Sequence, residues 1–321
     1  MEKLFFLMVL LVGISCSENT DSSGHSFTTV REIDKTSVVV LGTVQDAGYP
    51  QIGCTKSCCQ NIWGKHSNKL VTSLGLVDPQ SGKSWLFEAS PDLKFQTKTL
   101  SDLSGNIGVL MPEGIFLTHA HIGHYAGLIH LGRESMNAKK VKVFAMSRMS
   151  DYLKTNGPWS QLVTLENIDL QKLAADSTII LNSRLKVTPF LVPHRGEFSE
   201  TVGYRIESNK KRVLFIPDID KWHMWDRDII SEIQQVDVAF LDATFYQNGE
   251  VGNRDMSEIP HPFVEESINL FEQLPASEKA KIHFIHLNHT NPLLNTHSPQ
   301  RKDVLAKGYD IAEEGFVFEM N

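Results

Sequence analysis

Three histidines lie within six residues and directly follow a short apolar run. They are His119, His121 and His124, and the run is Gly114–Leu117. Residues two apart on an extended segment point to the same side, so His119 and His121 would direct both rings to one side of the chain. His124 would fall where the chain begins to coil into a helix. Neutral imidazoles are common zinc ligands, so the spacing predicts a metal site rather than a surface cluster of histidines.

Residues far along the chain must complete this site, because a zinc ion takes three or four ligands from the protein. Three candidates each follow an apolar run that is typical of a strand: His194, Asp218 and His286. Side chains at the ends of separate strands can converge at one edge of a sheet. We therefore expect these residues to join the histidine cluster.

A second group of potential metal ligands lies nearer the N-terminus. Cys54, Cys58 and Cys59 are three of the four cysteines in the chain. Adjacent cysteines cannot pair without severe strain, and three thiols do not form a self-contained set of disulfides. Three thiolates and one histidine from elsewhere make a common tetrahedral zinc site. The alternative is one disulfide with one free thiol, which an oxidising compartment would permit.

The fourth cysteine, Cys16, ends a stretch that is typical of an export signal. Leu4–Ile14 is apolar, follows a lysine and is too short to span a bilayer comfortably. The small residues before Cys16 resemble a bacterial lipoprotein signal, although Gly13 stands where such signals usually carry leucine. We predict a signal peptide over 1–16 with Cys16 lipidated, simple cleavage being the alternative, and a flexible tether over 17–36. The mature protein would be exported, as a periplasmic or outer-membrane-anchored lipoprotein.

The remainder of the chain, 37–321, alternates apolar β-type runs with helical segments. Strands are expected at 37–42, 69–77, 84–88, 115–118, 141–145, 178–181, 185–192, 201–207, 212–216, 236–241 and 282–285. Helices are expected from about 91 onward and at about 123–131, 147–154, 224–234 and 262–274. Strand-rich blocks closed by helices favour one α/β (α+β) domain in which two sheets pack face to face with helices outside. Periodicity alone does not decide that arrangement.

The histidine motif resembles that of a known superfamily. His119-Ala120-His121-Ile122-Gly123-His124 approximates HxHxDH, the metal-binding motif of the metallo-β-lactamase fold. Three segments are similar, more specifically, to the PqqB family, which is associated with biosynthesis of the redox cofactor pyrroloquinoline quinone: Gly48–Gln51, Leu86–Asp92 and Phe284–Pro292. The likeness runs from about Ser37 to Phe318. It implies a four-layer αββα sandwich.

The resemblance also implies a ligand set. A first metal ion would be held by His119, His121 and His194, and a second by His124 and His286, with Asp218 bridging the two. The related phosphodiesterase family PhnP has a structural zinc bound by cysteines and by a histidine three residues after the active-site one. The matching residues here are Cys54, Cys58, Cys59 and His289. Such a zinc would support folding rather than catalysis.

Gly123 departs from the motif, because the superfamily carries a metal-binding aspartate at that place. The absence of this aspartate removes one ligand and one negative charge from the site of the second metal ion. The second ion should therefore bind more weakly than the first, and one or two ions are expected in the active centre. Asp220 or Asp242 could supply a substitute carboxylate.

Further residues could assist the metal ligands. His261 lies between Pro260 and Pro262, opens a predicted helix and could face the cleft, where it would contact substrate or transfer a proton. Asp218 would orient a metal-activated nucleophile or accept its proton. Glu88 and Asp92 could accept hydrogen bonds from metal-bound imidazoles.

Composition limits the possible partners. The 31 basic and 38 acidic side chains give a net charge of −7, and no nucleic-acid motif stands out, so no nucleic-acid partner is expected. A membrane would be reached only through the lipidated N-terminus. The oligomeric state is left open.

These features predict a metal-dependent hydrolase that uses metal-activated water on a small-molecule ester, amide or phosphodiester. Zinc is the expected metal, with one structural ion and one or two ions in the active centre, where iron or manganese could also bind. Two alternatives stay open. One is a PqqB-like oxidoreductase that uses iron and is related to pyrroloquinoline quinone biosynthesis, and the other is a non-catalytic exported binding protein that retains the fold. Retention of all five ligand-type histidines argues against the latter.

Overall fold

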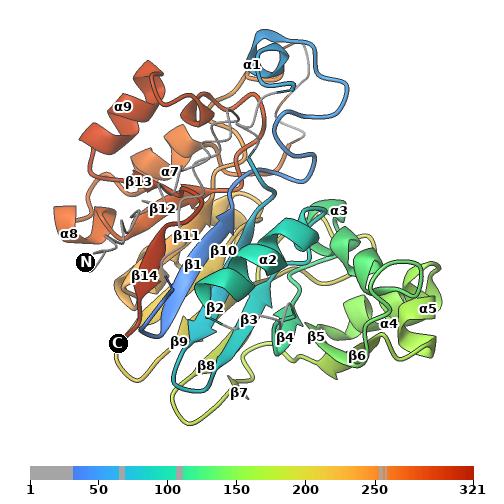
Figure 1. Ribbon diagram of the computed structural model, residues 1–321. Helices are drawn as coiled ribbons and strands as arrows, with labels where there is room; N and C mark the ends of the chain where they lie inside the picture. Colours follow the sequence, from blue (N-terminus) through green and yellow to red (C-terminus); the bar gives the residue numbers. More distant parts are fainter. Residues whose placement is uncertain (1–31, 65–68, 106–110, 253–255, 257–258) are drawn as a thin grey trace, which may run out of the picture. The chain divides into compact units, whose positions relative to one another are not determined.

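The computed structural model describes residues 32–64, 69–105, 111–252, 256 and 259–321 (Figure 1). All of them belong to one unit, Arg31–Asn321. The predicted signal peptide over 1–16, its lipidated Cys16 and most of the predicted tether over 17–36 lie outside the described residues, so export and lipidation stay predictions. Within the described ranges, no helix has both the length and the apolar character needed to cross a membrane.

Among the described residues, seven strands form the first sheet, in the order β14-β1-β2-β3-β4-β5-β6. Along the chain they are β1 (Ser37–Gly42), β2 (Ser73–Asp78), β3 (Lys83–Phe87), β4 (Gly114–Phe116), β5 (Val141–Ala145), β6 (Ile168–Lys172) and β14 (Val317–Glu319). Pairing is antiparallel from β14 to β3 and parallel from β3 to β6. In Figure 1 the red strand β14 lies beside the blue strand β1, so the two ends of the domain meet in one sheet.

The second sheet also has seven strands in the described part of the chain, in the order β13-β12-β11-β10-β9-β8-β7. They are β7 (Ile179–Ile180), β8 (Lys186–Leu191), β9 (Val202–Glu207), β10 (Arg212–Ile216), β11 (Val238–Asp242), β12 (Ile282–Ile285) and β13 (Asp310–Ile311). Strands β10 to β13 are parallel, whereas β7 to β10 are antiparallel. The chain therefore leaves β10, β11 and β12 at the same edge of the sheet.

The sheets pack face to face because successive residues of each strand enter different cores. On β1, Val38 and Val40 belong to the core between the sheets, whereas Val39 and Leu41 belong to the core under the helices. Between the sheets, the ring of Phe87 lies 5.4 Å from that of Tyr204. Both faces of β1 are buried, which is why its sequence is a continuous apolar run.

Helices cover the outer faces of both sheets. The first sheet is covered by α2 (Leu93–Leu103), the 3₁₀ helix η1 (Ala126–Leu131), α4 (Ser147–Thr155) and α5 (Trp159–Thr164). The second is covered by α6 (Ile229–Gln234), α7 (Val264–Leu270) and α9 (Pro299–Ala306). Shorter helices are α1 (Ser57–Gln60), α3 (Ile122–Tyr125), α8 (Ala276–Lys279), η2 (Trp222–Met224) and η4 (Pro292–Leu294). The four-layer αββα sandwich predicted from the sequence is confirmed.

Two of the helices differ from their predicted bounds: one is interrupted, and the other begins later in the chain. The helix expected at 123–131 is the short α3 followed by the 3₁₀ helix η1, where the backbone at Gly127 packs so closely on Ser90 that a Cβ there would lie 2.0 Å from the Ser90 carbonyl oxygen. The helix expected at 224–234 begins only at Ile229, because Asp228 caps it by accepting hydrogen bonds from the Ile230 and Ser231 amides.

Loops from both sheets meet beyond the ends of β1, β4, β8, β10, β11 and β12. His119 follows β4, His194 follows β8, Asp218 follows β10 and His286 follows β12. The loop after β1 is tied to the others through Val44, which forms β-bridges with Val71 and Leu287. This arrangement places residues from both sheets at one edge of the sandwich.

Candidate metal centre

Four side chains from three segments form the first ligand group. His119, His121, His194 and Asp218 each offer one ligand atom, and these atoms lie within 4.8 Å of one another. Asp218 Oδ2 is 3.3 Å from His119 Nε2, 3.4 Å from His194 Nε2 and 3.9 Å from His121 Nδ1. Ligands about 2.1 Å from one tetrahedral zinc ion would lie roughly 3.4 Å apart. The spacing of the group is therefore that of a single coordination sphere.

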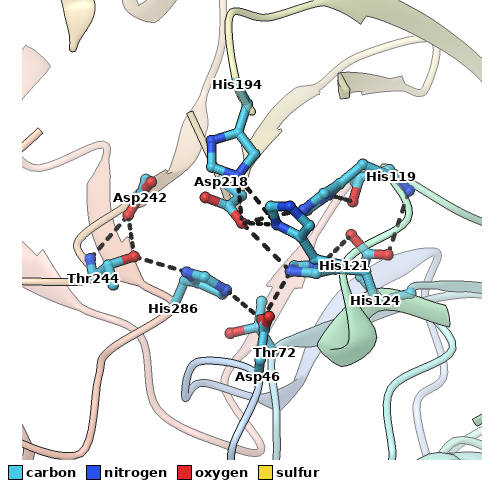
Figure 2. Close-up of polar contacts among 12 residues, drawn as sticks. Asp46, Thr72, His119, His121, His124, His194, Asp218, Asp242, Thr244 and His286 are labelled. Carbon is cyan, nitrogen blue, oxygen red and sulfur yellow. Dashed lines mark hydrogen bonds and ion pairs between the residues drawn. The ribbon is translucent and has the colours of Figure 1, made fainter. Parts of the chain in front are cut away.

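Three side chains form a second ligand group beside the first. Asp46 Oδ1 lies 3.2 Å from His124 Nε2 and 3.4 Å from His286 Nε2. Asp218 Oδ2 is 3.6 Å from His124 Nε2, so this carboxylate stands between the two groups, as the family resemblance implies. Figure 2 shows the side chains of both groups pointing toward one another from separate loops.

Two buried nitrogens test whether a cation fits. The His119 and His124 side chains are at most 1% exposed, and their Nε2 atoms make no hydrogen bond with any described residue, although carboxylate oxygens lie within 3.3 Å. An unsatisfied buried polar atom costs about 1–3 kcal/mol. Each of these nitrogens is directed into a ligand group, where a cation would satisfy it. The residues thus fit one or more metal ions.

The outward nitrogens of three histidines have hydrogen-bond partners, and that of His124 faces a carboxylate without a hydrogen bond. His119 Nδ1 lies 2.9 Å from Thr118 Oγ1, and His194 Nδ1 lies 3.0 Å from Asp220 Oδ1. His124 Nδ1 lies 3.1 Å from Glu88 Oε1, and His286 Nδ1 lies 2.9 Å from Thr244 Oγ1. Such outer contacts fix the tautomer and ring orientation of metal-binding histidines. Each Nε2 is thereby presented to the centre.

The carboxylate of the second group differs from the sequence expectation. Asp220 contacts the outward nitrogen of His194, and Asp242 accepts hydrogen bonds from the Ile219 amide and from Thr244, so neither stands beside His124 and His286. Asp46 stands there instead. Asp92, expected to orient an imidazole, accepts a hydrogen bond from the Val71 amide. The signal for Asp46 in the sequence was indirect: glycine at 123 requires a carboxylate from elsewhere.

His261 faces the centre, as the sequence suggested it could. Its Nδ1 lies 2.8 Å from Asp242 Oδ2 and 3.1 Å from Asp218 Oδ1. Burial alone would lower the pKa of His261, but the carboxylates of Asp242 and Asp218 raise it to about 9. A group of Asp218, Asp242 and His261 could itself hold a cation. Because its raised pKa keeps His261 protonated at neutral pH, His261 is a better candidate for a proton donor than for a metal ligand.

The electrostatics of the centre suit a divalent cation. Burial would raise the pKa of Asp218, yet His194, His261 and His286 hold it well below its ordinary value. Burial also lowers the pKa of His119 far enough to keep that imidazole neutral, as a ligand must be. For His124, burial would lower the pKa, but Glu88 and Asp46 raise it well above the ordinary value. A proton on His124 and a metal ion would therefore compete for one place.

One member of the second group and one residue beside it adopt left-handed backbone conformations. Glu88 has φ of 78° and His286 has φ of 67°. Such conformations in residues other than glycine cost about 1–3 kcal/mol each and tend to occur at functional sites. The surrounding sandwich holds both side chains against His124 and Asp46 despite this cost.

The cysteine cluster forms a separate ligand group. Cys54, Cys58, Cys59 and His289 each offer one ligand atom within 4.8 Å of the others, and the three cysteines are free. Cys54 Sγ and Cys58 Sγ are 3.7 Å apart. This is near the roughly 3.8 Å expected between two thiolates on one tetrahedral zinc, and far beyond a disulfide of about 2.05 Å. Burial raises the pKa of Cys58 to about 12, with the neighbouring cysteines adding to the effect, so the cluster calls for a cation to hold its thiolates.

A cavity of about 390 Å³ opens onto the centre. Its wall includes residues of both ligand groups together with His261, and they are Asp46, His121, His194, Asp218 and His261. Arg195 supplies a positive charge and Phe245, Ile259 and Pro260 supply apolar surface. The centre is thus accessible to a small molecule.

Comparisons with known proteins agree with the fold. A model of the family described as beta-lactamase superfamily domain matches residues 84–284, more than half of the 321 residues. Coenzyme PQQ synthesis protein B of Xanthomonas campestris pv. campestris (strain B100) is 28% identical over 309 residues, covering 88% of this chain and 99% of the relative.

Two solved structures share the fold. Zn(2+)-bound PqqB from Methylobacterium extorquens has a TM-score of 0.72 and 24% identity, covering 88% of this chain and 99% of that one. A diphosphatase from the PhnP family has a TM-score of 0.59 and 21% identity, covering 89% and 97%. The chain therefore belongs to the β-lactamase superfamily, and its similarity to PqqB extends over most of its length.

Proposed function

We propose that this chain is a metal-dependent hydrolase of small-molecule substrates. The observation that carries the proposal is the first ligand group, three imidazoles and one carboxylate, at the wall of an accessible cavity. Zinc bound there would lower the pKa of a bound water molecule to about 7, which supplies hydroxide at neutral pH.

Asp218 and His261 would carry the acid–base steps. Asp218 is ionised, belongs to the first ligand group and contacts His124 of the second. It can therefore orient the nucleophilic water and accept its proton. His261 lines the cavity and carries a proton at neutral pH, so it can donate that proton to the leaving group. Asp242 holds His261 in place through the 2.8 Å contact with Nδ1.

Zinc is the metal we propose for both regions. The cysteine cluster would hold one structural ion, because a closed set of three thiolates and one imidazole leaves no open ligand position. The first ligand group would hold one ion in the centre, and the second group can hold another. Iron or manganese could replace zinc at the histidines, which are less selective than thiolates.

Esters, amides and phosphodiesters are the proposed substrate classes. Arg195 lines the cavity, and its Nη2 lies 3.5 Å from His121 Nε2. The Nε of Arg195 forms an ion pair with Glu197 Oε1 at 3.0 Å. Its guanidinium favours a substrate with a negative charge near the centre, which places phosphodiesters first.

The test combines metal analysis with hydrolysis of one chromogenic substrate from each class. We expect metal-dependent turnover of at least one class, and a fall in kcat/KM of at least about 100-fold in His121→Ala. His297→Ala, a histidine exposed to solvent and away from the cavity, serves as the matched control. Protein that is replete with metal yet hydrolyses none of the three classes would overturn the proposal.

A second candidate function rests on the similarity to the curated Coenzyme PQQ synthesis protein B. In this proposal the same histidines hold redox-active iron, and the chain is an oxidoreductase related to that cofactor's biosynthesis. Iron in the purified protein together with oxygen consumption, and no hydrolysis, would favour it over the hydrolase.

We further propose that the chain is exported and attached to a membrane through Cys16. Fractionation of cells that produce the full chain or Cys16→Ala tests this: the full chain should be found with membranes, and the variant should be released from them.

A further inference from the structure

Asp46 lies on the loop after β1, far in sequence from the histidine motif, yet it completes the second ligand group. We propose that Asp46 supplies the carboxylate ligand of the second metal position, in place of the aspartate that HxHxDH carries at 123, and that Gly123 makes room for it. The inference rests on the metal binding in the proposed function, but not on the reaction.

The geometry of Asp46 is that of a ligand shared by two histidines. Its Oδ1 lies 3.2 Å from His124 Nε2 and 3.4 Å from His286 Nε2. The His124 side chain is fully buried, and its Nε2 makes no hydrogen bond with a described residue. Asp46 Oδ1 thus lies within hydrogen-bond distance of His286 Nε2 and beside a His124 nitrogen that has no hydrogen bond, so one ion could take all three atoms as ligands.

Gly123 and Asp46 compete for the same space. A Cβ built on Gly123 would lie 2.4 Å from Asp46 Oδ1 and 2.6 Å from Asp46 Cα. Real Cβ atoms essentially never approach other atoms to within 3.0 Å. A side chain at 123 and the present position of Asp46 therefore exclude each other. Asp46 occupies the place from which a motif aspartate would reach the metal.

The backbone holds the Asp46 loop firmly in this position. Gln45 donates its amide proton to the Leu287 carbonyl at 3.0 Å, and Leu287 is the residue after His286. Gly48 donates to the Gln45 carbonyl at 2.9 Å across the turn that contains Asp46. The loop of Asp46 and the loop of His286 are thus fastened together directly beside their ligand atoms.

Charge also favours a ligand role. Without Asp46, the second group would consist of two neutral imidazoles and a share of Asp218. Asp46 restores the negative charge that glycine at 123 removes, so the centre keeps two carboxylates for two divalent cations. A divalent cation prefers such a charged oxygen ligand over a further neutral one.

The experiment measures metal stoichiometry and affinity by titrating Zn²⁺ into the purified full chain with its cysteine cluster filled. The wild type should bind two ions in the centre. Asp46→Asn should weaken the second ion at least about 100-fold, because loss of an outer partner alone costs 10–100-fold, and should leave the first ion in place. Gly123→Ala keeps every ligand but places a Cβ 2.4 Å from Asp46 Oδ1, so it should weaken the second ion at least about tenfold and leave the first ion in place.

Controls separate a ligand from a merely structural residue. Asp102→Asn removes the same charge from an exposed ion pair on α2 and should leave both affinities unchanged. Thermal unfolding shows whether each variant is folded, and Gly123→Ala keeps the inference testable if Asp46→Asn unfolds. Second-ion binding that is absent from the wild type, or unchanged in Asp46→Asn or in a folded Gly123→Ala, would overturn the inference. Two tightly bound ions without hydrolysis would instead remove the proposed function and leave this inference standing.

Discussion

The cysteine cluster and the histidine centre gather their ligands in opposite ways. Three ligands of the cluster come from Cys54–Cys59, with His289 added from a distant loop. The two ligand groups of the centre draw on five separate segments, which only the assembled sandwich brings together. The first arrangement can organise its own loop around an ion, whereas the second depends on a fold that already exists.

The two regions are nevertheless joined by shared segments. Cys54 follows Asp46 on the loop after β1, and His289 follows His286 on the loop after β12. An ion in the cysteine cluster would clamp the two loops that carry the ligands of the second group. We therefore expect the cluster to govern stability and, through these loops, the second group more than the first.

Removing the cluster should have the largest effect. Cys58→Ala is expected to lose one zinc per chain and to lower the free energy of unfolding by roughly 3 kcal/mol or more, because metal binding contributes directly to folding. The melting temperature should fall by about 6 °C or more. Metal analysis and thermal unfolding check this, with the exposed neighbour substituted in Thr55→Ala as control. An unchanged melting temperature after loss of the ion would show that the cluster is not structural.

Removing a ligand of the centre should instead affect metal binding and activity with little effect on stability. His121→Ala is expected to lose the first active-centre ion and to keep the ion of the cysteine cluster. Its side chain is 16% exposed, so truncation opens no sealed cavity in a core. Metal analysis of His121→Ala beside Cys58→Ala is the measurement. Loss of the same ion in both variants would contradict two separate sites.

Of the two ligand groups, Thr244→Val should act on the second, although the Thr244 hydroxyl also lies 3.3 Å from His261 Nδ1. The Thr244 hydroxyl lies 2.9 Å from His286 Nδ1 and donates to Asp242 Oδ1 at 2.7 Å, so it fixes the ring of His286. Loss of such an outer partner lowers metal affinity by roughly 10–100-fold. Zn²⁺ titration should show this loss for the second ion. A loss confined to the first ion would show that His286 belongs to a different group.

Asp220→Asn is expected to have the smallest effect of these variants. It should change metal binding by the first ligand group. Asp220 lies 3.0 Å from His194 Nδ1, and an asparagine oxygen can still accept that hydrogen bond without the charge. Affinity for the first ion should fall by about tenfold, at the lower end of the range for outer partners. If titration shows no change, the charge of Asp220 does not influence His194.

The sequence was sufficient for those parts of the fold that are encoded locally. Strands β1, β5, β10 and β12 have the predicted bounds because apolar residues predominate in each, with Lys142 in β5 and His283 in β12 as the polar exceptions inside the strands. Strands β6, β13 and β14 were not predicted. β6 and β14 mix apolar with exposed polar residues, and β13 has only two residues, so no apolar run marks them.

The candidate site divides in the same way. The histidines were visible from their spacing and from the strands before them. Asp46 was not, because one aspartate in a loop carries no signal of its own, and its place depends on the β-bridge between Val44 and Leu287. That contact joins the first strand's loop to the loop after β12. Only the packing of the two sheets against each other establishes it.

The close approach of Gly123 and Asp46 restricts how the two positions can change during evolution of the family. A chain with aspartate at both positions would clash, and a chain with neither would lose the charge of the second group, so exchange between the two arrangements passes through an impaired intermediate. The two positions should therefore covary among homologues: where the motif aspartate is present, a small or uncharged residue should stand at the position of Asp46. Because a Cβ at 123 would also lie 2.6 Å from the Asp46 Cα, homologues with the motif aspartate should in addition have a different backbone path in this loop.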